Sequence, residues 1–289
     1  MQGHGQTGQQ EDQEAAQVQA RAPGERGRLA RWAAAGRQVY ARAALAARSA
    51  LAGAGPALLP SACALCGAVQ RDVVCGAVQR DVVCAPCAGD LLRPVRRCPA
   101  CALALGRHFS CPACAAMPPA FDHACTLGDY ASPQDQLVLA LKFGQALPLA
   151  GWLAARLAAG LPAAWSSARL GPPDLVAPIP LSPQRLAARG FNQAWEIARP
   201  LARGLGLRAD PVLLQRKRGT GSQRALDLAA RQVNLRDAFR LARPARLDGL
   251  HVALVDDVMT SGTTLHEAAR VLKAHGAAHV SVIVALRTP

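Results

Sequence analysis

The stretch Val252–Thr264 reads VALVDDVMTSGTT, and the organisation of the chain can be worked out from it. The apolar run from His251 to Val255 predicts a buried strand. Two adjacent carboxylates, Asp256 and Asp257, follow the run, and a hydroxyl-rich turn with a single glycine comes next. This order of strand, acidic pair, small-residue turn and helix start is typical of an α/β protein that binds an anion with a sugar beside it.

The residues after the turn predict a helix whose N-terminus faces the bound anion. Apolar residues recur from Leu265 at the i, i+3, i+4, i+7 spacing, and Gly276 lies where a C-terminal cap belongs. Backbone N–H groups of the turn and of the helix start attract a phosphate, and Gly262 lets the backbone approach it closely. Four hydroxyl groups can add donors, those of Thr260, Ser261, Thr263 and Thr264.

The two aspartates point to a different part of the ligand, because carboxylates would repel a phosphate. They suit the hydroxyl groups of a ribose or a magnesium ion. The simpler alternative is a buried strand that ends in a capped helix, with Asp256 and Asp257 solvated. That alternative explains neither the adjacency of the acids nor the cluster of hydroxyls.

Composition sets the broad class of the protein. The chain has 289 residues, of which 51% are apolar, enough for one medium domain with additions. Its net charge of +14 favours anionic partners: nucleotides, polyphosphates or nucleic acid. Neither an apolar run of transmembrane length nor a signal-peptide pattern is present, so we expect a cytoplasmic protein. In that setting, ten cysteines indicate metal binding and not disulfides.

Nine of the ten cysteines lie in residues 61–114, and eight of them form four C-x2-C pairs. One such pair can direct two thiolates at one ion, and two pairs complete a tetrahedral Zn(Cys)4 site. The spacing predicts a double zinc ribbon with two structural Zn²⁺ ions, which supply the folding energy that so short a segment lacks. An iron–sulfur cluster and disulfides are the competing interpretations. The predicted ligands are Cys63, Cys66, Cys84, Cys87, Cys98, Cys101, Cys111 and Cys114.

A perfect repeat interrupts the first ribbon. Cys66–Val74 reads CGAVQRDVV, and Cys75–Val83 repeats it letter for letter. We expect the extra nine residues to be looped out, since a register in which Cys75 replaces Cys66 would lose a knuckle. Cys125 lies outside all pairs and is expected to be a buried, ordinary thiol.

The chain is expected to divide into three parts: an N-terminal extension, 1–58, the ribbons, 59–117, and an α/β domain, 121–289. The extension is expected to be disordered at first and helical from 28 to 54. The expected strands are 124–130, 174–180, 212–216, 238–241, 251–255 and 279–286, and the expected helices are 133–143, 149–160, 193–205 and 265–275. Residues 165–173 and 181–193 are expected to be loops. The alternation implies a mostly parallel sheet with helices on both faces.

The segment Leu181–Gln193, LSPQRLAARGFNQ, follows the second of these strands. Arg185 and Arg189 place planar guanidinium groups there, and such groups suit a diphosphate. Because ligands of open α/β sheets lie at the carboxyl ends of the strands, this segment and the Asp256 turn can face one cavity. The polar segment 217–236, with glycines at 219 and 221, is expected to move as a loop.

The Asp256 turn resembles the phosphoribosyl-diphosphate (PRPP) loop of type I phosphoribosyltransferases. With the other motifs in order, the chain from about Pro60 resembles the ComF family, phosphoribosyltransferase-like proteins with a double zinc ribbon that are linked to competence and DNA uptake. Besides the cysteine pairs and the turn, the resemblance rests on three motifs: L-K-F at Leu141–Phe143, P-I-P-L-S with R-G-F-N-Q at Pro178–Gln193, and Q-x2-L-x4-R-x2-N-x4-F at Gln223–Phe239. The nine-residue repeat and the N-terminal extension depart from the family pattern.

The resemblance implies a type I phosphoribosyltransferase fold that binds PRPP with Mg²⁺. It implies that Asp256 and Asp257 hold the ribose hydroxyls and that Arg185 or Arg189 stabilises the leaving pyrophosphate. The implied PRPP-binding residues are Val258, Met259, Thr260, Ser261, Gly262, Thr263, Thr264, Pro180, Leu181 and Ser182. The implied residues of the closing loop are Thr220, Gln223, Arg231 and Asn234. No general base is evident, and the acceptor is open.

Three functions are compatible with these features. The first is a Mg²⁺-dependent phosphoribosyltransferase that acts in DNA uptake. The second is an adaptor without chemistry that keeps the fold and binds single-stranded DNA or proteins of the uptake machinery through its ribbons. The third is a salvage enzyme for a nucleobase.

Overall fold

The computed structural model describes residues 61–70, 82–144, 146–217 and 238–289. The N-terminal extension, Cys75 and the predicted closing loop, with Thr220, Gln223, Arg231 and Asn234, lie outside the described residues.

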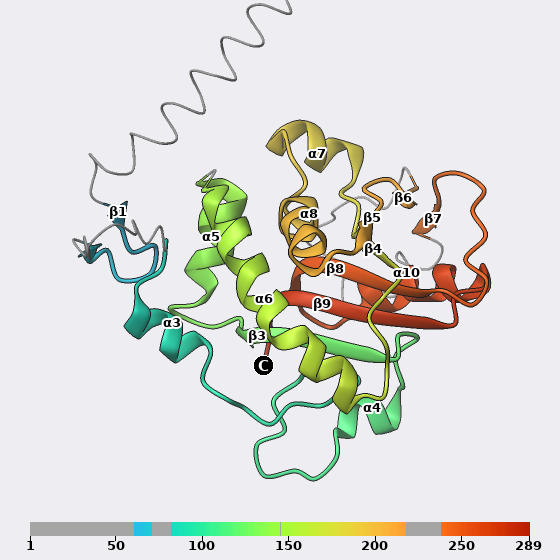
Figure 1. Cartoon of the computed structure of the whole chain (residues 1–289), viewed down its shortest axis with the longest axis horizontal. Coiled ribbons are helices and arrows are strands. Elements are labelled where there is room, and N and C mark those ends of the chain that lie inside the picture. The colour runs from blue at the N-terminus through green and yellow to red at the C-terminus, as the bar shows by residue number, and fades with distance from the viewer. Residues whose placement is uncertain (1–60, 71–81, 145, 218–237) are drawn as a thin grey trace, which may run out of the picture. The chain divides into compact units, whose positions relative to one another are not determined.

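A five-stranded sheet forms the centre of the described chain (Figure 1). All four neighbouring pairs run parallel, in the order β3-β9-β8-β4-β5. The strands are β3 (His123–Asp129), β4 (Leu175–Pro178), β5 (Arg208–Ala209), β8 (His251–Met259) and β9 (His279–Arg287). β8 and β9 are nearly continuous apolar runs, as expected of parallel strands that are covered on both faces.

Helices cover both faces of the sheet, and alternate strand residues supply the two cores. Ala253 and Val255 of β8 belong to one apolar cluster, with the helices α6 and α8, whereas Val252 and Leu254 belong to the other, with α10. Figure 1 shows α6 and α8 in front of the sheet and α10 behind it. The helices are α5 (Asp135–Phe143), α6 (Pro148–Ser167), α7 (Pro183–Arg189), α8 (Gln193–Leu205) and α10 (Thr263–Ala274).

The cysteine-rich segment contributes only short elements. These are β1 (Ser61–Ala62), paired antiparallel with β2 (Val69–Gln70), and the helices α3 (Ala85–Leu91) and α4 (Pro112–Ala116). The predicted strands 212–216 and 238–241 exist as β6 (Leu214–Arg216) and β7 (Phe239–Leu241), but they pair antiparallel with each other, apart from the main sheet. Across the residues described, no helix is both long and apolar enough to span a bilayer.

The structure corrects several predicted boundaries. β8 does not end at Val255 but continues to Met259, because its backbone stays paired with β9 there; the acidic pair therefore lies in the strand. The predicted loop 181–193 contains α7, which Ser182 caps and Gly190 ends in the left-handed conformation. α6 continues to Ser167 through the start of the predicted loop 165–173, because Trp165 still faces the core.

Candidate functional site

Asp256 and Asp257 lie near the carboxyl end of the central strand β8. Asp257 is buried, and its Oδ2 lies 2.6 Å from Nζ of Lys142 at the end of α5. The two acids are also held by the backbone: the Asp257 N–H donates to Asp256 Oδ1 at 2.9 Å, and the Val258 N–H donates to Asp257 Oδ1 at 2.9 Å. The carboxyl groups are thus fixed in place at the end of a rigid strand.

The environment of Asp256 disfavours its charge. Although the residue as a whole is half-buried, protein atoms enclose its carboxyl group, and this burial raises its pKa well above the ordinary value. The neighbouring charge of Asp257 raises the pKa further, while the Asp257 N–H and Lys142 act in the opposite direction. A site with two crowded carboxylates and one lysine attracts a cation or hydrogen-bond donors.

The segment after β4 meets the end of α5. The Arg189 guanidinium lies 5.5 Å from the centre of the Phe143 ring, next to the lysine that pairs with Asp257. Arg189 also donates to Gln193 Oε1, and Asn192 Nδ2 donates to the carbonyl of Ile179 at 3.0 Å. These contacts bring residues of the motifs L-K-F, R-G-F-N-Q and the acidic pair to one edge of the sheet.

Arg216, at the end of β6, links the arginine segment to the acids. Burial lowers the pKa of Arg216, the charge of Arg185 lowers it further, and Asp256 raises it. Arg185 and Asp256 are therefore both close enough to Arg216 to influence its pKa.

The hydroxyl turn has the conformation that its glycine permits. Gly262 precedes α10 with φ of +80°, in the left-handed region, and α10 has no side-chain N-cap. Ser261 Oγ and Thr263 Oγ1 lie 2.8 Å apart, while Thr260 and Ser261 are exposed. The first N–H groups of α10 and these hydroxyls remain suited to an anion.

The other predicted PRPP-binding residues have mixed surroundings. Met259 is fully buried, so its side chain supports the turn from within. Its carbonyl accepts the Thr288 N–H at 3.0 Å. Val258, Thr264, Pro180 and Leu181 are half-buried. Ser182 Oγ accepts the Arg185 N–H at 3.3 Å, which caps α7 and orients the arginine segment.

Three residues join the site without having been assigned to it from sequence. Lys142 lies within the L-K-F motif, and that motif was the available signal. Arg216 ends a predicted strand, and nothing in its local pattern marked it. Arg287 is buried at the end of β9 and donates to carbonyls of the turn, which only the strand pairing reveals.

The eight predicted cysteines form two tetrads, Cys63/Cys66/Cys84/Cys87 and Cys98/Cys101/Cys111/Cys114, whose sulfur atoms lie within 4.8 Å of one another in each. Zn–S bonds of about 2.3 Å in a tetrahedron give sulfur–sulfur edges of about 3.8 Å. The observed separations fit: 3.7 Å for Cys66–Cys84, 3.7 Å for Cys101–Cys111 and 3.8 Å for Cys98–Cys114. Both tetrads can hold zinc.

Backbone N–H groups already favour thiolates in the first tetrad. The N–H groups of Leu65 and Cys84 donate to Cys63 Sγ at 3.4 and 3.3 Å. Burial alone would raise the pKa of Cys63. These two hydrogen bonds, together with hydrogen bonds from Cys66, outweigh the effect of burial and lower the pKa to about 6. The thiol of Cys125 is different: the residue is half-buried and not fully buried as expected, its Sγ lies 3.6 Å from His123 Nδ1, and burial raises its pKa to about 12.

Comparison with known proteins agrees with this fold. The family model described as phosphoribosyl transferase domain matches residues 192–289. The DNA utilization protein YhgH of Salmonella typhi is 37% identical over 203 residues, which cover 70% of this chain and 88% of the relative. Competence protein F of Haemophilus influenzae is 32% identical over 173 residues, 60% of this chain and 76% of the relative.

Fold and site thus define a protein with a type I phosphoribosyltransferase fold and two cysteine tetrads of zinc-ribbon type. The chain belongs to the ComF family, together with these relatives. Among solved structures, a hypoxanthine phosphoribosyltransferase from Staphylococcus aureus is 13% identical, covering 48% of this chain and 65% of that one, with a TM-score of 0.32.

Proposed function

We propose that the chain binds PRPP together with Mg²⁺ and transfers its phosphoribosyl group to an acceptor. The proposal is supported by three contacts near the carboxyl end of β8: Lys142 pairs with Asp257, the Arg189 guanidinium lies over the neighbouring Phe143 ring, and Arg185 and Asp256 both influence the pKa of Arg216. Residues 121–289 would form the domain that does this, and residues 59–117 a double zinc ribbon attached to it.

Each group has a role that its chemistry supports. Asp256 and Asp257 would accept hydrogen bonds from the ribose hydroxyls, and the turn 258–264 would hold the 5-phosphate at the N-terminus of α10. Arg185 and Arg189 would stabilise charge on the departing pyrophosphate as the bond to C1 breaks. Mg²⁺, when bound, would neutralise part of that same charge.

Ligand binding would also relieve a strained arrangement. The pKa of Asp256 is raised by burial and by Asp257, so the two acids of the free site repel each other although Lys142 pairs with Asp257. Donors from ribose hydroxyls stabilise the charged forms of both acids. The arrangement therefore favours a polyhydroxy ligand over a simple phosphate.

Titration calorimetry with PRPP tests the proposal, with and without Mg²⁺, on the wild-type chain and on Asp256→Ala/Asp257→Ala. We expect binding that strengthens with Mg²⁺ and is lost in the double variant. Asp248→Asn is the control: this exposed acid precedes β8, at the opposite edge of the sheet, and the change should leave affinity as it is. Absence of heat at millimolar PRPP, or equal affinity in the double variant, refutes the proposal.

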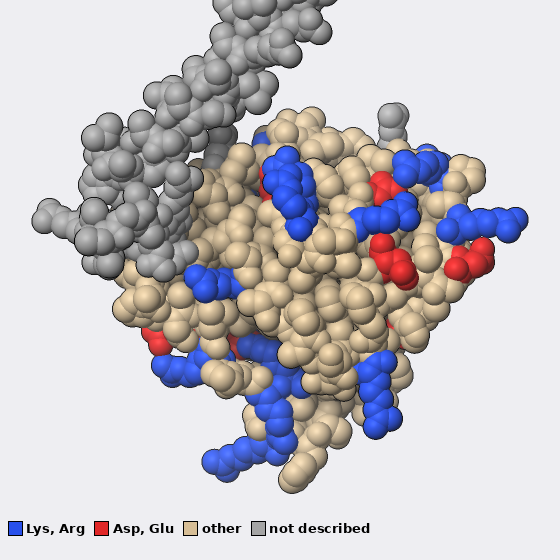
Figure 2. Space-filling view, viewed as in Figure 1, with Lys and Arg blue, Asp and Glu red and all other residues tan. Residues whose placement is uncertain are grey.

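A second candidate function is single-strand DNA binding in DNA uptake, favoured by one exposed aromatic ring. Phe109, between the third and fourth cysteine pairs, is 94% exposed, and the Arg96 guanidinium lies 5.7 Å from its ring centre. Figure 2 shows Lys and Arg side chains over the region that leads to α4. An exposed ring among cations can stack a nucleobase while the cations contact phosphates.

Fluorescence anisotropy with a labelled single-stranded oligonucleotide tests the second candidate. We expect affinity that falls with rising salt and weakens in Phe109→Ala by about 1–3 kcal/mol, the usual size of one stacking contact. Met117→Ala removes another exposed apolar side chain, 67% exposed, and should change affinity little. Equal losses in both variants would argue against a stacking role for Phe109.

A further inference from the structure

Arg287 connects the second cysteine tetrad to the hydroxyl turn. Its guanidinium is buried at the end of β9, where Arg287 pairs with Met259 across the sheet. Nη1 donates to the carbonyls of Met259, at 3.2 Å, and Thr260, and Nε donates to the carbonyl of Cys101 at 3.1 Å. One rigid, planar group therefore holds the backbone of a metal-ligand residue and the start of the predicted phosphate loop at the same time.

The carbonyl of Cys101 belongs to a knuckle whose shape a metal ion would set. Cys98 and Cys101 lie on either side of a tight turn in which Ala102 N–H donates to the Cys98 carbonyl at 2.8 Å. Ala102 has φ of +57°, a conformation that a non-glycine residue adopts only when its surroundings enforce it. Two thiolates on one ion would be such a constraint, so metal loading would help to set the position of the Cys101 carbonyl.

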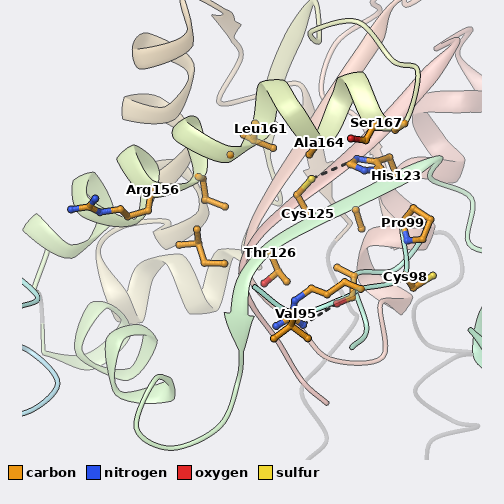
Figure 3. Close-up of a pocket in the computed structure, with 17 residues that line it drawn as sticks. Val95, Cys98, Pro99, His123, Cys125, Thr126, Arg156, Leu161, Ala164 and Ser167 are labelled. Carbon is orange, nitrogen blue, oxygen red and sulfur yellow. Dashed lines mark hydrogen bonds between the residues drawn. The ribbon is translucent and has the colours of Figure 1, made fainter. Parts of the chain in front are cut away.

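On its β3 side, the knuckle is not closely packed against the rest of the domain. A cavity of about 510 Å³ lies between residues 95–102, β3 and α6. Figure 3 shows Cys98 and Pro99 across this space from Leu161 and Ala164 of α6. Besides Arg287, the knuckle is tied to β3 by the Ala124 N–H, which donates to the Pro99 carbonyl at 2.9 Å, and by Arg97, 2.7 Å from Asp129 Oδ1.

We propose that Arg287 couples zinc binding at the second tetrad to the conformation of the phosphate loop, residues 258–264. A metal-bound knuckle fixes the Cys101 carbonyl, Cys101 orients the guanidinium, and the guanidinium holds the Met259 and Thr260 carbonyls in the binding-competent turn. The proposal rests on the proposed function, because the loop is taken to hold the 5-phosphate. The second tetrad then regulates the site as well as stabilising the ribbon.

Linkage makes the coupling reciprocal. If zinc raises the affinity of the loop for a phosphate ester, the phosphate ester raises the zinc affinity by the same factor. Couplings between two sites commonly amount to about 5- to 150-fold in affinity. Zinc affinity is therefore a readout that needs no catalysis.

The test measures zinc release from the full chain by competition with a chromogenic chelator, with and without saturating ribose 5-phosphate. We expect ribose 5-phosphate to raise the zinc affinity of one release phase at least about fivefold. Cys111→Ser/Cys114→Ser, which removes only the second tetrad, identifies that phase. Arg287→Met should abolish the increase, and Arg287→Lys, which keeps the charge but not the fork, should abolish most of it.

Arg97→Met is the matched control, because Arg97 also ties the knuckle to the domain but donates to Asp129 and the Ala102 carbonyl, not to the loop. It should keep the coupling. A coupling that survives in Arg287→Met, or that vanishes equally in both variants, overturns the proposal while ribose 5-phosphate binding itself still stands.

Amide hydrogen exchange of residues 258–264 gives a second measurement without ligand. Exchange should be faster after zinc removal and in Arg287→Met, and unchanged in Arg97→Met. If the zinc-loaded wild type binds no ribose 5-phosphate, the proposed function fails, and the exchange result still decides the link between knuckle and loop: equal exchange in wild type and Arg287→Met refutes it.

Discussion

Both ends of β8 carry buried polar groups, but the two ends differ in how the chain pairs these groups. At the amino end, His251 Nδ1 donates to the Gly171 carbonyl at 3.0 Å, which leaves Nε2 to accept from Ser281 Oγ at 2.8 Å. The His251 N–H donates to Asp174 Oδ2 at 2.8 Å. At the carboxyl end, two acids crowd one another, and the pKa of Asp256 is raised by burial and by its neighbour.

The difference separates structural polar groups from groups arranged for a ligand. At the amino end each ring nitrogen has a partner within the chain, so the arrangement stabilises the fold. At the carboxyl end, burial and the charge of Asp257 raise the pKa of Asp256, so keeping both acids charged costs stability in the free protein. Polar groups that destabilise the free protein are a mark of a binding site.

The largest effect is expected from removing Lys142, the lysine that pairs with Asp257 at the carboxyl end of β8. Lys142→Met leaves Asp257 buried without its ion pair, and breaking a buried pair typically costs about 3–5 kcal/mol. Urea denaturation should show a loss of about 3 kcal/mol in the free energy of unfolding, most of it recovered in Lys142→Met/Asp257→Asn. Lys273→Met, which breaks the more exposed pair with Asp122, should cost less than about 1 kcal/mol.

If the double variant were no more stable than Lys142→Met alone, the lysine would act through packing and not through charge. That result would remove the contrast between the two ends of the strand, since neither end would then hold uncompensated charge.

The next effect concerns the amino end. His251→Leu keeps the apolar volume but leaves Ser281 Oγ and the Gly171 carbonyl without this partner, which should cost about 2 kcal/mol by the same measurement. His279→Leu alters the neighbouring, exposed ring and should change stability by less than about 0.5 kcal/mol. Equal effects of the two variants would show that the hydrogen bonds of His251 are not what stabilises this end.

How far the sequence predicted this strand depends on which end is considered. The apolar residues 252–255 predicted a buried strand, and the fold class is confirmed. The strand continues four residues further because β9 pairs with it as far as Arg287, and pairing between neighbours overrides the low strand preference of two aspartates. A pattern within one segment does not contain that information.

The same contrast between local sequence patterns and tertiary contacts applies to the candidate site. The cysteine pairs, the acids and the arginine segment were visible because each is a local pattern of residue types. Lys142 and Arg216 enter the site only through tertiary folding. Arg287 was the hardest to foresee: its carbonyl partners lie 28 and 186 residues away, and carbonyls leave no trace in the residue types.

A smaller effect on stability is expected at Gly262, in the turn between β8 and α10. Its φ of +80° strains any other residue, and an added Cβ would lie 3.5 Å from Met259 Sδ, which is ordinary contact. Gly262→Ala should therefore cost about 1–2 kcal/mol through the backbone alone. Gly151→Ala, within α6 and with open space around the added Cβ, should stabilise by about 0.5–1 kcal/mol. Thermal unfolding distinguishes the two, and a neutral Gly262→Ala would contradict the left-handed turn.

The smallest expected effect is the change of the free energy of unfolding with pH. The groups at the two ends of β8 should contribute to this change with opposite signs. Burial lowers the pKa of His251, and burial followed by the charge of His251 lowers that of His123. The unfolded chain therefore binds protons first as pH falls below about 6.5, and stability is lost on the acid side. The raised pKa of Asp256 acts the other way: the folded state keeps a proton that the unfolded state releases above about pH 3.9, so stability is lost as pH rises from there.

Asp256→Asn isolates the second contribution, because it removes the charge that the fold disfavours. Relative to wild type it should be more stable by about 1 kcal/mol at pH 8, within the usual range of stabilising substitutions. The difference should shrink as pH falls towards about 4, where the unfolded chain also begins to bind the proton. The same variant should bind PRPP less well. Denaturation of both proteins across pH 4–8 measures the difference. A gap that stays constant with pH would mean that the asparagine acts by packing, and the carboxyl end of β8 would then be no more poised for a ligand than the amino end.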